Sequence, residues 1–178
     1  MKKAFQIVML ALLAFGMMAC GEKKLTEDDL KKAELTLTDD QGNLNKETAP
    51  AVVEKFCKFV EQHPDDASSP IWLFKAMQIE IKAEESEKAI ELCNKLVEDY
   101  PTFEHNPAAL MMTASEVYDG QLHDLDKARA TYEKVINDYP DSDWAKNAER
   151  MIEFLGLTPE EILSRIVLSN MEVEDGEL

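Results

Sequence analysis

The nine residues CNKLVEDYP, at positions 93–101, recur as YEKVINDYP at 132–140 and, in a more divergent form, as FCKFVEQHP at 56–64. The prolines that close these segments lie 37 and 39 residues apart. Apolar residues stand four and eight positions before each proline, which places them on one stripe of a helix. A proline cannot continue that helix. The pattern therefore predicts three helices that end just before Pro64, Pro101 and Pro140.

A second helical segment is expected after each of these prolines, at residues 71–83, 108–118 and 142–155. Pro70 and Pro107 are expected near the first positions of two of these segments. The first two segments match at an offset of 37, whereas the helices after them match at 39. Turns tolerate insertions, so we expect the two extra residues in the turn at 119–125. The chain is predicted to be all-α, a short α-solenoid of about three helix pairs.

Both ends of the predicted solenoid carry sequences suited to capping. Residues 26–47 are expected to form a short N-terminal helix and a turn. Residues 48–168 are expected to form the repeat domain. Its last helix opens with a capping box at residues 158–161, and Ile162, Leu163 and Ile166 of that helix are expected to cover the last repeat. Residues 169–178 are interpreted as an acidic, disordered tail.

The first twenty residues are interpreted as a targeting segment. Lys2 and Lys3 precede an apolar run at 7–19 that is too short to span a membrane, so residues 1–19 are predicted to be a signal peptide. Residues 17–20, Met-Met-Ala-Cys, resemble a bacterial lipobox, with Met17 where leucine is usual. The resemblance implies cleavage before Cys20, acylation of Cys20, and a lipidated tether at 20–25. An ordinary signal peptide with a chance cysteine is the alternative.

The net charge and the residue composition argue against several classes of function for this chain, nucleic-acid binding and metal binding among them. The formal net charge is −17, and no cluster of Lys and Arg offers a surface for phosphates, so no nucleic-acid partner is expected. After removal of Lys2 and Lys3 the charge becomes −19, and anionic head groups should repel such a body. The three histidines are scattered and none pairs with a cysteine at ligand spacing, so no metal or cofactor is expected. Adjacent carboxylates stand where helices begin, which favours capping over acid–base catalysis.

The repeat resembles the tetratricopeptide repeat, a helix pair of similar length. The resemblance is carried by small residues at Ala89 and Ala128, by the closing Pro64, Pro101 and Pro140, by Cys93 and Tyr132 on the same helices, and by Tyr118 at the end of a first helix. Phe59, Leu96 and Val135 depart from it, because a small residue is usual there. Residues 130–145 resemble more specifically the envelope group that includes BamD and YbgF/CpoB, and the whole chain resembles small lipoproteins of the Bacteroidetes type.

This resemblance implies a non-enzymatic scaffold that binds protein partners in the cell envelope, anchored to the outer membrane by its N-terminal lipid. Outer-membrane protein assembly and the coordination of cell-wall synthesis or constriction are the two roles it suggests. The sequence does not locate a binding groove. The alternative is a lipoprotein that captures glycan or peptide for an uptake system, which requires Trp72 or Trp144 to be exposed; we expect both to pack. Cys57 and Cys93 are either free or paired.

Overall fold

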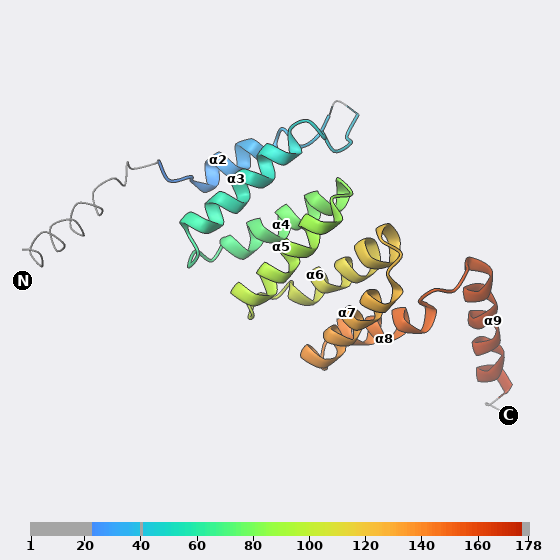
Figure 1. The fold of residues 1–178 in the computed structure, drawn as a ribbon. Helices are drawn as coiled ribbons and strands as arrows, with labels where there is room; N and C mark the ends of the chain where they lie inside the picture. The colour runs from blue at the N-terminus through green and yellow to red at the C-terminus, as the bar shows by residue number, and fades with distance from the viewer. Residues whose placement is uncertain (1–22, 40, 176–178) are drawn as a thin grey trace, which may run out of the picture.

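The computed structural model describes the backbone of residues 23–39 and 41–175, and side chains as far as Val167. The predicted signal peptide and Cys20 lie outside the described residues. Helices stack side by side in one row, and α9 stands apart from them (Figure 1). Their bounds are α2 Glu27–Glu34, α3 Ala49–Gln62, α4 Ser69–Lys82, α5 Ser86–Asp99, α6 Asn106–Met112, the π-helix η1 Thr113–Gln121, α7 Leu125–Asp138, α8 Asp143–Phe154 and α9 Pro159–Asp175. This architecture confirms the predicted α-solenoid.

One apolar stripe of each helix forms a core that runs through the row. On α5 and α7 the equivalent positions are buried to 1% exposure or less: Ala89, Cys93, Leu96, Ala128, Tyr132 and Val135. The alanines leave room for a neighbouring helix to approach closely, while the larger residues fill the layers between helices. The core is therefore continuous from α2 to α8.

The same hydrogen-bonded turn joins successive helix pairs. A side chain at the start of the next helix donates to a backbone carbonyl near the end of the previous one, at 2.5 to 2.8 Å. A backbone N–H three residues after that carbonyl also donates to it, at 3.0 to 3.1 Å. The donor and acceptor pairs of the side-chain bonds are Ser69 and His63, Asn106 and Tyr100, and Ser142 and Tyr139. The donor lies six residues after the acceptor in the first two turns, whereas in the third it is Ser142, the N-cap of α8, three residues after the acceptor. These turns fix the angle at which each pair leaves the one before it.

The two extra residues of the second pair lie inside its first helix, so their expected place in the turn is wrong. Helix α4 has 14 residues, whereas α6 and η1 together have 7 and 9. The turns that follow, 83–85 and 122–124, have equal length. A π-helix places more residues in each turn, as the bond from Leu122 N to Val117 O at 2.8 Å shows, and thereby absorbs the insertion.

The side chain of Gln121 holds the end of this widened helix in place. Its Nε2 donates to the carbonyl of Ile81 at 2.9 Å, and its Oε1 accepts from Ser86 Oγ at 2.6 Å. Gln121 therefore binds the turn after α4, and the two first helices end side by side despite their unequal lengths.

Helix α8 closes the solenoid because its outward positions are charged. The backbone N–H groups of Ser69 and Ala145 occupy the same place in their turns. Counting four and eight residues onward gives Leu73 and Met77 in α4, both fully buried, but Glu149 and Glu153 in α8, both exposed. Carboxylates at these two positions prevent a helix from stacking on α8 there as α5 stacks on α4, although Met151 and Phe154 of α8 remain partly exposed beside them.

Helix α9 forms as expected but does not cover the last repeat. Its capping box is present, with Thr158 N donating to Glu161 Oε2 at 2.8 Å. Leu163 is 64% and Ile166 44% exposed, which corrects the expectation that they cover the last repeat. Of the three expected residues only Ile162 is partly buried, and it lines a hollow with Met151 and Phe154 of α8. The helix continues to Asp175, so most of the expected disordered tail is helical.

Glu84 is expected to limit stability, since it occupies the left-handed region with a φ of 64° at the end of α4. Glu85 N donates to Glu80 O at 2.9 Å across it, an arrangement that normally favours glycine. Glu84→Gly should therefore raise the free energy of unfolding by about 1 kcal/mol, measured by urea denaturation. Lys82→Gly, in the last helical turn, is the matched control and should lower it by about 1 kcal/mol. A loss of stability in Glu84→Gly would contradict this account.

Candidate interaction surface

The residues that carry the repeat signature lie in the core or at helix ends. Ala89, Ala128, Cys93 and Tyr132 are buried, and Tyr118 is partly buried. Burial raises the pKa of Tyr132 to about 12. Pro64, Pro101 and Pro140 each follow a helix by two residues and are exposed. These positions hold the helices together, so the surface that meets other molecules lies elsewhere.

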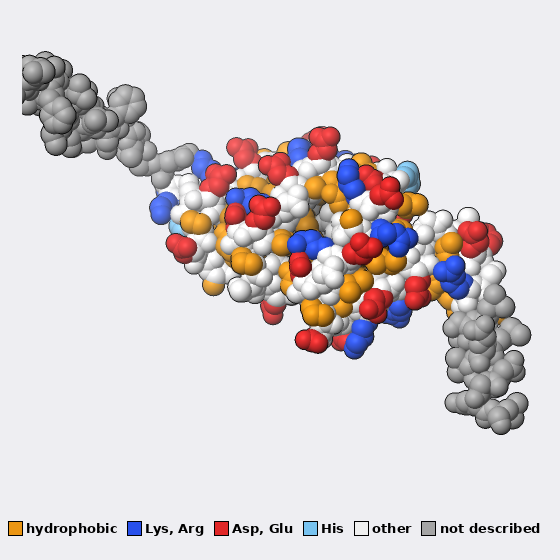
Figure 2. All heavy atoms as spheres, turned by 60° about the horizontal axis from the view of Figure 1, so that its bottom comes forward, with side chains coloured by type: hydrophobic (Ala, Val, Ile, Leu, Met, Phe, Trp, Pro, Cys, Tyr) orange, Lys and Arg blue, Asp and Glu red, His pale blue; other side chains and the backbone are white. Residues whose placement is uncertain are grey.

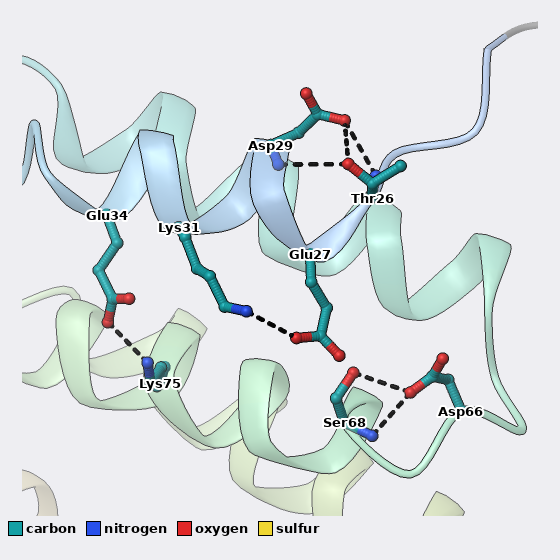
Figure 3. Close-up of polar contacts among 8 residues, drawn as sticks. All are labelled: Thr26, Glu27, Asp29, Lys31, Glu34, Asp66, Ser68 and Lys75. Atoms are coloured by element: carbon teal, nitrogen blue, oxygen red, sulfur yellow. Dashed lines mark hydrogen bonds and ion pairs between the residues drawn. The ribbon is translucent and has the colours of Figure 1, made fainter.

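The first helices of successive pairs share one face of the solenoid, which we call the first-helix face. It joins α2, α4 and α6. Lys75 Nζ of α4 lies 2.7 Å from Glu34 Oε1 of α2 (Figure 3). Gln78 Nε2, one turn further along α4, lies 3.9 Å from the sulfur of Met112 on α6. Polar side chains therefore connect these helices across the face.

A hollow of about 340 Å³ opens on this face between α4 and the loop that follows α2. Its walls combine apolar side chains with amides, a hydroxyl and lysines. The lining residues are Glu34, Leu37, Thr38, Gly42, Asn43, Leu44, Lys75, Gln78, Ile79 and Lys82. Polar side chains outnumber apolar ones in this lining, which suits a hollow that binds a partner through hydrogen bonds and charge as well as apolar contact.

The loop that forms one wall is braced internally. Asp39 Oδ1 accepts from the backbone N–H groups of Gln41 and Asn43, both at 2.8 Å. These bonds hold the pKa of Asp39 below its usual value, that to Asn43 most strongly. An antiparallel bridge joins Thr38 to Leu44, and Gly42 supplies the positive φ of 86° that the turn requires. The wall is therefore preorganised, which reduces the entropy lost when a partner binds.

Lys75 is fixed between two groups at the floor of this face. Besides its bond to Glu34, its Nζ lies 4.4 Å from the centre of the Trp72 ring. Trp72 is only 4% exposed, so it packs as expected and offers no stacking platform. Trp144 is 40% exposed at the start of α8, which differs from the expectation that it packs, but it does not line the hollow on the first-helix face.

Members of two pairs of adjacent carboxylates, Asp28-Asp29 and Asp65-Asp66, cap a helix and a turn. Asp29 Oδ2 accepts from Thr26 N at 3.0 Å, and Asp66 Oδ1 accepts from Ser68 N at 2.8 Å (Figure 3). Hydrogen bonds from Thr26 and Ser68 lower the pKa values of these two carboxyls. Groups held ionised in this way are suited to stabilising helix starts rather than to general acid catalysis.

Cys57 and Cys93 are free thiols. Burial is the main cause that raises the pKa of Cys57 to about 11, and it also raises the pKa of Cys93. Both are therefore protonated near neutral pH and poor nucleophiles. Within the described ranges, no three His, Cys, Asp or Glu side chains are grouped so as to hold a metal ion. No helix in the same ranges is long and apolar enough to cross a bilayer.

Sequence reasoning missed the residues that shape the hollow. Lys75, Gln78 and Lys82 lie on a helix that was identified from its apolar residues alone. These three polar residues are spaced three and four apart, which places them on one side of the helix and was the available signal. The turn at residues 39–43 was expected, but nothing in the sequence placed it beside α4. The hollow depends on that tertiary contact.

The comparison with known families agrees with the geometry of the two central helix pairs. A family model described as tetratricopeptide repeat matches residues 73–102 and 108–142. These ranges correspond to α4 with α5 and to α6, η1 and α7. No curated protein matches the chain.

Glu80 should make stability depend on pH. It is 5% exposed, and burial raises the pKa of its carboxyl above the ordinary 4.5. The folded chain therefore holds this proton more tightly than the unfolded chain, so stability is lost as pH rises from about 4.5 through the raised pKa. Glu80→Gln should remove this loss and be more stable than the wild type at neutral pH, measured by urea denaturation across that range. The exposed Glu87→Gln is the control, and equal pH profiles for Glu80→Gln and wild type would contradict the prediction.

Proposed function

We propose that this chain, whose central helices are tetratricopeptide repeats, is a lipid-anchored, non-enzymatic scaffold that binds protein partners at the bacterial cell envelope. Stacked helix pairs of this kind present extended surfaces to other proteins. The observation that carries the proposal is the braced hollow on the first-helix face, between α4 and residues 37–44.

The hollow suits an extended segment of a partner protein. Leu37, Leu44 and Ile79 offer apolar contacts, and the amides of Asn43 and Gln78 offer both donors and acceptors. The exposed Lys82 adds a cation at the end of α4. Apolar contacts supply affinity, whereas the polar groups fix the register of the bound segment.

The proposed anchor is an acyl group on Cys20, and the charge distribution favours it. Residues 23–58 hold seven Lys and eight Asp or Glu, whereas residues 59–178 hold ten Lys or Arg and 27 Asp or Glu. Lys23, Lys24, Lys32 and Lys55 line a second hollow, of about 540 Å³, between α2 and α3. The part of the body next to the tether is therefore nearly neutral, and an anionic bilayer would repel mainly the far end.

Two envelope roles follow from the resemblance to the group of BamD and YbgF/CpoB. One is assembly of outer-membrane proteins, and the other is coordination of wall synthesis with constriction. In either role the lipid anchor would hold the scaffold at the outer membrane, and the first-helix face would bind the partner.

A photo-crosslinking amino acid at Gln78 tests the surface in living cells. We expect crosslinks to one or a few envelope proteins, identified by mass spectrometry, because Gln78 lines the hollow. The same amino acid at Glu91, exposed on α5, is the matched control and should capture far less. Assembly machinery or wall synthases among the products would select between the two roles. Equal products from both positions would contradict the proposed surface.

The anchor is tested separately by Cys20→Ala. We expect this variant to move from the membrane fraction to the soluble envelope fraction, because no acyl chain remains to hold it. Retention of the variant in membranes to the same extent as the wild type would overturn the lipid anchor and leave the proposed binding surface unaffected.

A further inference from the structure

A second apolar surface lies where the solenoid ends, at the junction of η1, α8 and α9. A hollow of about 310 Å³ opens there, with walls that are mostly apolar and a carboxylate at one side. Its lining residues are Asp119, Met151, Phe154, Leu155, Gly156, Leu157, Thr158 and Ile162. Ile166 follows Ile162 by one helical turn, and Leu163 and Val167 lie beside them. The hollow and these three residues of α9 together are called the C-terminal apolar surface.

None of the side chains that the structure describes covers these three residues of α9. Leu163, Ile166 and Val167 are 64%, 44% and 48% exposed. Local bonds fix the direction of α9, since Arg165 Nη1 donates to Glu153 O at 2.7 Å and the capping box closes around Thr158. Glu149 and Glu153 of α8 are themselves exposed and supply no apolar cover. The surface is therefore open to another molecule.

The charges around this surface indicate what kind of molecule fits it. Residues 143–167, whose side chains the structure describes, hold five Asp or Glu and three Lys or Arg. Each of those three cations is already bound to an oxygen of the chain: Lys146 to Asp143, Arg150 to Asn147 and Arg165 to Glu153. Figure 2 shows hydrophobic side chains beside acidic and basic ones at the base of α9. Asp119 adds a carboxylate within the hollow itself.

We propose that the C-terminal apolar surface binds a basic amphipathic helix of a partner protein. The apolar stripe of such a helix would lie along α9 and in the hollow, while its lysines or arginines would meet the surrounding carboxylates. A second copy of this chain is a poorer match, since its own surface there is equally acidic. This inference rests on the proposed scaffold function and adds a second contact, with a stated partner chemistry, at the opposite end from the tether.

The test uses the predicted mature chain, residues 20–178 with Cys20→Ala, so that neither an acyl chain nor the apolar run at 7–19 competes for apolar surface. The probe is a fluorescent synthetic peptide of about 18 residues, with leucines on one helical face and lysines on the other. We expect saturable binding by fluorescence anisotropy, weakening as NaCl rises from about 50 to about 300 mM. A twin peptide with glutamates in place of the lysines should bind at least about tenfold more weakly.

A variant that removes the stripe assigns the binding to its site. Leu163→Ser, Ile166→Ser and Val167→Ser together should weaken binding of the lysine peptide about tenfold. The unfolding transition of the solenoid should stay unchanged, since these side chains are exposed. Leu35→Ser is the matched control, because Leu35 is 83% exposed near α2, and it should bind as the wild type does.

Three results would overturn this inference. The first is equal binding of the lysine and glutamate peptides, and the second is undiminished binding of the lysine peptide by the triple variant. The third is a wild-type protein that is dimeric by light scattering while the triple variant is monomeric, which would make a second copy of the chain the occupant. Each leaves the scaffold proposal standing if Gln78 still crosslinks a partner. Loss of crosslinks at Gln78 with retained peptide binding would instead count against the first-helix face.

Discussion

The bond between the start of one helix and the end of the helix before it sets the geometry of the whole solenoid. A carbonyl near the end of α3, α5 and α7 is free of its helical partner, and each time a side chain at the next helix start donates to it. The same contact therefore satisfies an orphan acceptor and fixes the angle between pairs. The turns after α3 and α5 share this geometry, with the donor six residues after the carbonyl, so α4 and α6 leave the preceding helices in the same way. The hollow on the first-helix face lies between α4 and the loop after α2, so its shape depends on where α4 is placed.

The helices were predictable from the sequence because periodicity reports local burial. Apolar residues four and eight before each proline, and prolines that end the helices, predicted the pairs. The π-helix was not predictable in the same way. The offsets of 37 and 39 between equivalent helices require two extra residues in the second pair. A longer turn and a widened helix accommodate two extra residues equally well. The contacts of Gln121 with Ile81 and Ser86 favour the helix, and those contacts join residues far apart in the chain.

The candidate surfaces could be predicted less well than the core. Lys75 and Gln78 contribute to a surface only because tertiary packing brings Glu34, Met112 and the loop after α2 next to them. The exposure of α9 could have been predicted, because aligning Ala145 with Ser69 places Glu149 and Glu153 where α4 has Leu73 and Met77. Those two carboxylates are what a helix stacked on that side of α8 would contact.

Glu149 and Glu153 also have an evolutionary consequence. A solenoid lengthens when a repeat is duplicated, and a new pair can stack only on an apolar face. Here two carboxylates occupy positions that are apolar and buried in α4, so a further pair could not stack on α8 as α5 stacks on α4. A duplicated pair would join the row more readily upstream of α8, where these positions are apolar.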